Sequence, residues 1–278
     1  MQQEVLDRLH KRELDILDEV DRVCHKLGLR YYIIAGTLLG AIRHGGFIPW
    51  DDDLDIVMPR KDYEVFLKEC NNHISDDFFC QSRYNLEVFP NNFSKVRIKN
   101  TTFVERDLVA VDDRMQMGIY IDVFPLDDAK KEEGIQKFQK YFIERATVLY
   151  QIKEGLYDDA AVWKKILAAL FTKKALLKIR YNLAVWKDNE SYPYYVNFGS
   201  KYSIKKQTIL KSRYGNPVRV KFEDREYDAP EDYLYILEHI YGSKYMELPP
   251  ESKRVTHNPV RLSFDLSGPD EVFEEGNK

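Results

Sequence analysis

The chain has 278 residues, enough to bury a sizeable core in one large domain or two closely packed ones. Hydrophobic residues make up 44% of it and charged residues 32%, a balance that excludes a disordered chain and a multispan membrane protein. The net charge of −4 gives no overall attraction to nucleic acid, so an anionic ligand must be bound by a local basic patch.

The cysteines and the first residues indicate a reducing compartment. Cys24, Cys70 and Cys80 form no CxxC pair and no metal-ligand spacing, so we expect free thiols and no zinc site. The opening residues, MQQEVLDRLHKREL, lack the apolar stretch of a signal peptide, and no apolar run reaches the roughly 18 residues of a spanning helix. We therefore expect a cytoplasmic protein.

A helix and a strand open the chain. Residues 5–27 carry apolar side chains at helical spacing, and Gly28 is suited to end that helix. The following run, RYYIIA at residues 30–35, is aromatic and β-branched, which is typical of a buried strand. We expect Gly36 to end this strand.

The next segment predicts a short helix. Thr37 is placed to cap a helix over residues 38–44, and Gly45 and Gly46 end it. The first amides of a helix have no partner within it and lie at its positive end, so they can hold phosphate oxygens. We therefore expect an anion-binding turn at Gly36 and Thr37.

Residues 48–58, IPWDDDLDIVM, place four carboxylates within five positions. Like charges so close together repel each other, so this run requires either full solvation or a cation among the oxygens. From Asp53 onward polar and apolar residues alternate, which predicts a strand with Asp53 and Asp55 on one face, about 6.6 Å apart. Two aspartates at this spacing can bind one or two hard cations.

The acidic run could also form a solvated turn or a calcium loop. A solvated turn is the simpler alternative to a metal site, and it stays open. An EF-hand calcium loop needs glycine at its sixth position and glutamate at its twelfth, where a loop starting at Asp51 has Ile56 and Asp62. The EF-hand is therefore disfavoured.

A third acid follows further along the chain. A helix is expected over residues 61–70, and short strands over residues 78–83, 93–99 and 101–105. Residues 118–125, GIYIDVFP, alternate again, with the aliphatic residues on one face and Asp122 on the other. Asp122 is thus expected to face away from the core.

Lys95, Arg97 and Lys99 alternate along one of the expected strands, so they share a face. That face can meet a nucleotide or an anionic acceptor. A solvated strand face is the alternative.

Helices are expected over residues 130–153 and 160–187, and this change from strand-rich to helix-rich sequence near residue 128 marks the expected domain boundary. Residues 160–187 contain seven lysines and arginines and no acid, interleaved with Trp163, Trp186 and leucines. They predict a basic amphipathic helix or helix pair that contacts an anionic membrane. A core helix with a solvated basic face is the alternative.

The order of strand, Gly-Thr turn, helix, two aspartates and a third aspartate resembles the active site of the nucleotidyltransferase fold. The stretch GTLLGAIRHGGFIPWDDDLDI at residues 36–56 closely resembles the LicD family. Softer matches to the same family are SKVRIKNTTF at 94–103, IDVFPLD at 121–127, and the closing run from Tyr241 through Leu248-Pro249-Pro250 to Arg254 and His257.

The resemblance implies an α/β fold, with a mixed β-sheet flanked by helices and a helix-rich C-terminal half. Residues 1–128 would form the catalytic core, and residues 129–278 a helical region whose closing motif completes the active-site cleft. LicD-like proteins transfer phosphocholine from CDP-choline to a sugar hydroxyl of a surface glycan such as teichoic acid or lipopolysaccharide, whereas the related fukutin group transfers ribitol phosphate.

The resemblance also implies the partners of the chain. They are CDP-choline and a lipid-linked glycan acceptor, with no nucleic acid. Transfer of a nucleoside monophosphate to a small molecule or protein stays open as an alternative reaction, because it needs the same metal site. A non-enzymatic metal-binding or interaction protein is disfavoured, because it would not need three acids on two strands beside a Gly-Thr turn.

Carried over position by position, Asp53 and Asp55 match the metal-binding pair of the family, and Asp122 matches the third carboxylate, as metal ligand or base. The expected ion is Mg²⁺, with Mn²⁺ as the alternative. Asp51 and Asp52 are either supporting residues of this site or solvated side chains.

Gly36 and Thr37 match the phosphate-binding turn, and Arg43 and His44 the basic pair after the short helix. Arg43 is the better candidate for the diphosphate because its planar guanidinium matches phosphate geometry, whereas His44 can instead satisfy carbonyls at the helix end. Trp50 can stack on a base or close the loop. With Lys95, Arg97 and His257 these residues form the expected substrate-binding set, in which the role of His257 is not assigned.

Overall fold

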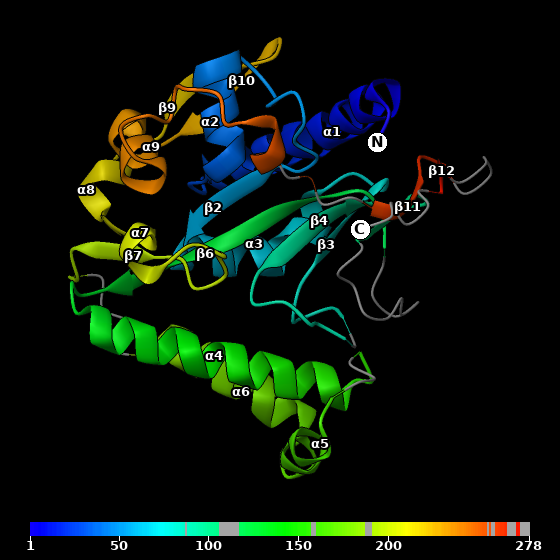
Figure 1. Ribbon diagram of the computed structural model, residues 1–278, viewed down its shortest axis with the longest axis vertical. Coiled ribbons are helices and arrows are strands. Elements are labelled where there is room, and N and C mark those ends of the chain that lie inside the picture. The colour runs from blue at the N-terminus through cyan, green and yellow to red at the C-terminus, as the bar shows by residue number, and fades with distance from the viewer. Residues whose placement is uncertain are drawn as a thin grey trace.

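The computed structural model describes residues 1–86, 88–105, 117–156, 160–186, 191–254, 256, 259–265 and 271–272. Helices flank a mixed β-sheet, which confirms the expected fold class (Figure 1). The main path of the sheet runs β1-β2-β6-β4-β3, β7 pairs with β6, and β8 pairs with β7. These strands are β1 (Tyr32–Ile33), β2 (Asp55–Pro59), β3 (Phe78–Gln81), β4 (Ser94–Ile98), β6 (Tyr120–Ala129), β7 (Tyr194–Val196) and β8 (Thr208–Leu210).

The helices expected in the first part of the chain are present. They are α1 (Gln3–Leu27), α2 (Ala35–His44) and α3 (Arg60–His73). Gly28 and Gly45 follow α1 and α2 with φ values of 65° and 75°, a left-handed conformation that glycine adopts without steric cost, so both glycines end a helix as expected. Helix α2 begins at Ala35 rather than at residue 38, so Thr37 lies within its first turn and is not its cap.

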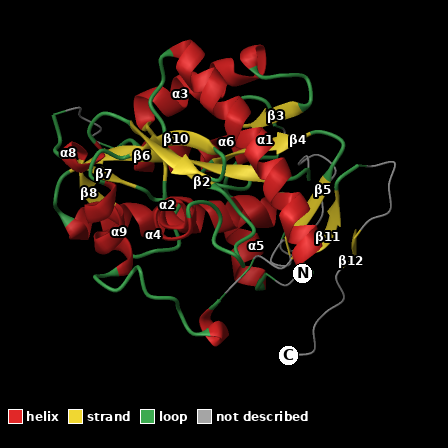
Figure 2. Cartoon of the chain, turned by 90° about the horizontal axis from the view of Figure 1, so that it is seen from above, coloured by secondary structure: helices red, strands yellow, loops and turns green. Residues whose placement is uncertain are grey.

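Helix α3 packs on one face of the sheet, as Figure 2 shows from above. The Tyr63 hydroxyl of α3 lies 2.8 Å from Ser94 Oγ of β4, and Arg60 at the start of α3 donates to Asp127 of β6. Helix α1 contacts α3, β4 and β6 and buries its apolar face, including Leu9, Ile16, Leu17, Val20 and Val23.

The expected helix over residues 130–153 is α4 (Glu133–Lys153), and the segment 160–187 forms a helix pair, α5 (Val162–Ala169) and α6 (Lys173–Ala184). A domain boundary at residue 128 falls inside β6, because this strand runs to Ala129 and its last residues pair with β7. The largest core cluster likewise includes residues from Val5 to Leu262.

The later elements of the chain pack against or pair with elements of the first half. Its elements are α7 (Ile204–Gln207), α8 (Lys211–Tyr214), β9 (Val218–Phe222), β10 (Arg225–Ala229), α9 (Tyr233–Tyr241), a 3₁₀ turn (Glu251–Lys253), β11 (Pro259–Ser263) and β12 (Glu271–Val272). Strand β11 pairs with β12 and with β5 (Thr102–Glu105) of the first half. No helix in the described part of the chain has the length and apolar content needed to cross a bilayer.

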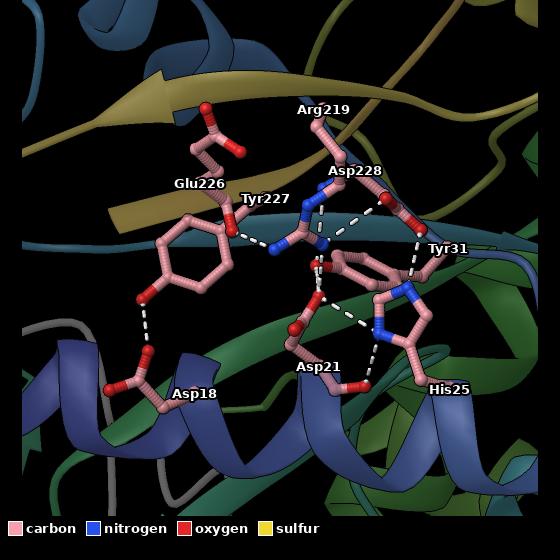
Figure 3. Close-up of polar contacts among 8 residues, drawn as sticks. All are labelled: Asp18, Asp21, His25, Tyr31, Arg219, Glu226, Tyr227 and Asp228. Atoms are coloured by element: carbon pink, nitrogen blue, oxygen red, sulfur yellow. Dashed lines mark hydrogen bonds and ion pairs between the residues drawn. The ribbon is translucent and has the colours of Figure 1, made fainter.

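Polar contacts fasten the β9–β10 hairpin to α1 (Figure 3). Arg219 Nη1 of β9 lies 2.6 Å from Asp21 Oδ1 of α1 and 3.2 Å from Asp228 Oδ1 of β10. The Tyr227 hydroxyl donates to Asp18 Oδ1 at 2.6 Å, and the Tyr31 hydroxyl donates to Asp21. The hairpin is therefore held to the first helix by an arginine ion pair and a tyrosine hydrogen bond, both to aspartates of α1.

Candidate active site

Strand pairing brings the acids of two distant segments together. Strands β2 and β6 are parallel, with Asp55 opposite Asp122, and the antiparallel strand β4 places Lys95 on the other side of Asp122. Residues opposite each other in a sheet point to the same face. Asp55, Asp122 and Lys95 therefore form a row across three strands, and Asp53 lies just before β2.

Two adjoining cavities meet at these acids. The larger cavity has a volume of about 640 Å³ and the smaller one about 400 Å³, both within the size range of small-molecule sites. The residues that line both cavities are Ala35, Asp53, Asp55, Glu105, Lys201 and Tyr202. Asp122 and Lys95 line the smaller cavity, and Asp51 lines the larger one.

Asp122 lies on the opposite face of β6 from Ile121, as expected, but it is buried rather than solvated. Lys95 Nζ lies 2.8 Å from Asp122 Oδ1 and 3.3 Å from Glu105 Oε1. Burial raises the pKa of the Asp122 carboxyl, and the Lys95 ammonium opposes that rise. The base of the smaller cavity thus holds the buried Asp122 and Lys95 side chains together with the partly buried Glu105 carboxylate.

The first turn of α2 contacts the acidic segment through Thr37 and Gly36. Thr37 Oγ1 accepts a hydrogen bond from the Asp55 amide at 2.8 Å, so the threonine fixes the first residue of β2. A Cβ on Gly36 would lie 2.6 Å from Asp51 Oδ2, so only glycine leaves room for this carboxylate. Ala35, where the two cavities meet, has a φ of 50°, which is strained for a residue with a side chain.

The acidic loop also rests on α1. Asp52 is almost fully buried, so it is not a solvated side chain. Glu13 of α1 is buried too, and its pKa is raised well above the usual range by burial and then by Asp53, Asp52 and the other acids of the loop. His10 Nε2 lies 2.8 Å from the Asp51 carbonyl oxygen. The sequence predicted no role for Glu13 or His10, because helical spacing alone places both on α1 without relating them to the loop.

Arg43, on the last turn of α2, and Trp50 line the larger cavity. Arg43 Nη1 donates to the carbonyls of Tyr245 at 3.0 Å and Glu247 at 3.3 Å, and its Nε donates to His44 Nε2 at 2.9 Å. Burial and the Arg43 charge lower the pKa of His44. The Arg254 guanidinium lies over the Trp50 ring, with Arg254 Cζ 4.5 Å from the ring centre.

Among the described residues of the expected substrate-binding set, Thr37, His44 and Arg97 line neither cavity. Arg97 is buried and donates to the Gly118 carbonyl. Burial lowers its pKa. His257 lies outside the described residues. The alternative of a solvated strand face is wrong for Lys95 and Arg97, since both are buried.

Several lining residues were missed by sequence reasoning. Glu105 lies two residues after Phe103 on β5, so both side chains point to the same face of the strand. This alternation and the contact with Lys95 were the signals that could have identified Glu105. Tyr202 and Tyr241 line the larger cavity with ring centres 5.8 Å apart. Burial raises the pKa of both hydroxyls. No sequence pattern distinguishes these two from the other tyrosines of the chain.

One cluster of possible metal ligands in the described part of the chain lines neither cavity. Asp21, His25 and Asp228 present ligand atoms within 4.8 Å of one another. Arg219 already places a cation between the two aspartates, as Figure 3 shows. We interpret this group as the fastening of the β9–β10 hairpin rather than as a metal site.

Comparison with known proteins relates the chain to a family. Residues 28–148 match the family described as LicD/FKTN/FKRP, nucleotidyltransferase domain. Over 263 residues the chain is 27% identical to the lipopolysaccharide cholinephosphotransferase LicD of Haemophilus influenzae, covering 88% of this chain and 92% of that protein. A stretch of 34 residues, 12% of this chain and 7% of the relative, is 53% identical to the ribitol 5-phosphate transferase FKRP of Homo sapiens. The family expected from the motifs is confirmed.

Proposed function

Since residues 28–148 belong to the LicD/FKTN/FKRP nucleotidyltransferase family, we propose that the chain is a metal-dependent transferase that moves phosphocholine from CDP-choline to a hydroxyl group of a cell-surface glycan precursor and releases CMP. The observation that carries the proposal is the meeting of two cavities at Asp53, Asp55 and Glu105. This arrangement suits a transferase, because donor and acceptor can reach the same acids from two sides.

The larger cavity suits the nucleotide. Its volume of about 640 Å³ is lined by Trp50 for stacking on the base and by Arg43, Lys201 and Lys244 for contacts to phosphate oxygens. The α2 amides near Gly36 add the positive end of a helix dipole on the same side. We assign CMP, the leaving group, to this cavity.

The smaller cavity suits the choline group and the acceptor. Phe93 and Phe124 line it with ring centres 4.3 Å apart, and Asp122 and Tyr202 line it as well. Aromatic faces and carboxylates both attract a quaternary ammonium group. We assign the phosphocholine group to this cavity, where the acceptor hydroxyl also enters.

We assign a magnesium ion to Asp53, Asp55 and Asp122. Asp53, Asp55 and Asp122 offer the oxygen ligands that Mg²⁺ prefers, two of them on paired positions of adjacent strands, and Mn²⁺ would accept the same ligands. When bound, the ion would neutralise the charge of the diphosphate. Lys95 holds Asp122 in place from the other side.

The proposed reaction forms one bond and breaks one. The acceptor oxygen bonds to the phosphorus that bears choline, and the bond from this phosphorus to the bridging oxygen of the diphosphate breaks. The bridging oxygen leaves with CMP. The hydroxyl proton passes to a carboxylate, and Asp122, which lines the acceptor cavity, is the candidate.

A double-label experiment tests the proposal. The protein is incubated with Mg²⁺, a glycolipid acceptor of the lipopolysaccharide or teichoic acid type, and CDP-choline labelled either in choline or in cytidine. We expect choline label in the acceptor, cytidine label only in CMP, and neither product with Asp53→Asn. Cytidine label in the acceptor would support transfer of a nucleoside monophosphate instead. Transfer from CDP-ribitol but not from CDP-choline would support the ribitol phosphate alternative.

We further propose that the acceptor is a lipid-linked glycan precursor at the cytoplasmic face of the membrane. The relative from Haemophilus influenzae is named for lipopolysaccharide, and this supports an acceptor of that type. The acceptor series of the same experiment, run with lipopolysaccharide and teichoic acid precursors side by side, identifies which of them takes the label.

A further inference from the structure

Helix α5 carries its large apolar side chains on its solvent side. Ala168 is the buried residue of this helix, at 2% exposure, and Lys153 Nζ of α4 donates to its carbonyl at 3.4 Å. The large apolar residues exposed on this helix and at its C-cap are Val162 (73%), Trp163 (62%), Ile166 (61%), Leu167 (37%) and Leu170 (74%). Their spacing of i, i+1, i+4, i+5 and i+8 places them on one face of the helix.

This arrangement reverses that of an ordinary surface helix. A surface helix places its apolar stripe against the core and its charged residues in water, because burial of apolar area stabilises the fold. Helix α5 instead turns a small alanine inward and a tryptophan and aliphatic residues outward. The alternative of a core helix with a solvated basic face fits α6, where Leu176 is buried and Lys174 exposed, but not α5.

The surroundings of this apolar face are basic. Residues 160–187 contain seven lysines and arginines and no acid. On α6, which follows directly in the chain, Lys174 and Lys178 are exposed one turn apart. Lys164 Nζ lies 5.6 Å from the centre of the Trp163 ring. A partner with an apolar centre and negative charge around it would complement these residues.

Further exposed aromatic side chains lie on α4 and just after α6. Phe138 and Phe142 have ring centres 4.5 Å apart, Tyr141 packs against Phe142, and Trp186 lies 6.2 Å from Phe138. All four side chains are exposed. Figure 1 shows α4, α5 and α6 together at one end of the molecule.

We infer that α5 docks on an anionic lipid bilayer, with its five apolar side chains entering the interface and Lys174 and Lys178 contacting lipid phosphates. Tryptophan, aliphatic side chains and lysines are the residues that interfacial helices use in this way. The eight residues of α5 are too few to span a bilayer, so the helix lies in the plane of the surface. The inference deepens the proposed function, because it brings the cavities to a surface where lipid-linked acceptors reside, but the docking itself needs neither donor nor acceptor.

Vesicle sedimentation tests the docking with the full chain. Vesicles contain either phosphatidylcholine alone or phosphatidylcholine with phosphatidylglycerol, and no substrate is present. The apolar variant is Trp163→Gln with Leu170→Gln, and the charge variant is Lys174→Glu with Lys178→Glu. Lys173 is left unchanged because it lies 2.6 Å from buried Glu154, so its reversal would disturb the fold.

The matched controls change exposed residues of other helices. Leu234→Gln on α9 serves for the apolar variant, and Lys11→Glu with Lys26→Glu on α1 serves for the charge variant. We expect the parent to bind vesicles that contain phosphatidylglycerol and to lose binding in high salt. Both test variants should bind at least about tenfold more weakly, and the controls should bind like the parent.

Three results would overturn the inference: no binding of the parent, equal binding with and without phosphatidylglycerol, or unchanged binding of the two test variants. A fourth result that would overturn the inference can come from sedimentation without lipid. If the parent self-associates and the apolar variant does not, a second copy of the chain covers α5. Transfer to a water-soluble acceptor fragment is measured in parallel, so a failure of the proposed function is seen separately from a failure of docking.

Discussion

Asp122 has a lysine as its nearest charged neighbour, and this contact decides how the carboxylate is held. Lys95 Nζ lies 2.8 Å from it on the adjacent strand, and both side chains are buried beside the partly exposed Glu105. A buried carboxylate without a counter-charge would cost several kcal/mol, so Lys95 makes the position of Asp122 possible. Asp53 and Asp55 lie at the edge of both cavities instead, where donor and acceptor meet.

Asp53→Asn and Asp55→Asn should each abolish transfer without unfolding the protein. Each change removes a proposed metal ligand and one charge from a crowded acidic loop, so the free energy of unfolding measured without metal should stay equal or rise. Turnover at saturating Mg²⁺ and urea denaturation are the two measurements. If either variant kept more than a few per cent of the parent turnover, the metal assignment would be wrong.

Asp122→Asn should lower kcat about 10²–10⁴-fold, because Asp122 is the candidate that takes the proton of the acceptor hydroxyl. It should weaken donor binding less than it lowers kcat, because Asp122 lines the smaller cavity and not the larger one assigned to CMP. Asp128→Asn, further along the same strand, is the control and should keep kcat near that of the parent. Steady-state kinetics with donor and acceptor varied in turn separates the two constants. Equal losses in donor affinity and rate would instead mark Asp122 as a binding ligand alone.

At the scale of elements, the spacing of apolar residues predicted the helices and strands that depend only on which side chains are buried. Apolar spacing gave α1, and alternation gave β2 and β6, because both patterns follow from the side on which each side chain must be buried. Pairing between distant strands was not predictable in this way. Residues 194–196 and 208–210 carry no signal that they extend the sheet beside β6, and the position of α2 one turn earlier depends on the Thr37 contact with Asp55.

The same limit applies to the candidate site. The aspartates could be identified because they interrupt apolar strands at fixed spacing. Tyr202 and Tyr241 could not, because they reach the cavities only through the packing of the later helices. The sequence predicted a basic amphipathic segment at α5. It did not predict that the apolar face points outward, because this depends on how the helix packs.

Helix α1 is tied to the end of α3 by one buried acid, and this contact gives a pH-dependent prediction. Glu19 accepts from Arg22 at 2.6 Å and 2.8 Å and from the Ser75 amide at 2.6 Å. The hydrogen bonds from Arg22, more than any other contact, lower the pKa of Glu19 from 4.5 to about 2. A lowered pKa stabilises the fold above pH 4.5, and this contribution is lost as the pH falls toward 2.

Glu19→Gln should therefore reduce the free energy of unfolding by about 1 to 2 kcal/mol at neutral pH, because solvent around the half-exposed Arg22 weakens the interaction. The difference from the parent should shrink as the pH falls below 4.5, because the parent loses the same interaction when Glu19 is protonated. Chemical denaturation of parent and variant at neutral pH and at about pH 3 measures both values. Glu4→Gln at the exposed start of α1 is the control. A difference that stays constant between the two pH values would contradict the prediction.

At the scale of the whole molecule, the β9–β10 hairpin connects the later part of the chain to the acidic loop. Arg219 and Tyr227 fasten the hairpin to α1. At its tip, Glu223 accepts from the Phe47 amide at 3.0 Å, and the Glu223 amide donates to the Gly45 carbonyl at 2.7 Å. The segment that leads into the acidic loop is thus held between α2 and the hairpin, so the hairpin contributes to the site without lining it.

Gly46→Ala tests this connection. A Cβ at this position would lie 1.9 Å from Glu223 Oε1, so the glutamate must move and give up its bond to the Phe47 amide. Glu223→Asn removes the same bond by shortening the side chain, and asparagine tolerates the φ of 56° at this position. Each variant should lose about 1 kcal/mol of unfolding free energy and several-fold in kcat/KM, because the loop bearing Trp50 and Asp51 is held less firmly.

The double variant distinguishes a shared cause from two separate ones. If both changes act by breaking the contact between Glu223 and Phe47, the Gly46→Ala, Glu223→Asn protein should lose little more than either single variant, because the bond can be lost only once. Chemical denaturation and kcat/KM of the four proteins complete the cycle. Additive losses in both measurements would mean that Gly46 and Glu223 support the acidic loop independently, and the hairpin would then stabilise the fold without controlling the site.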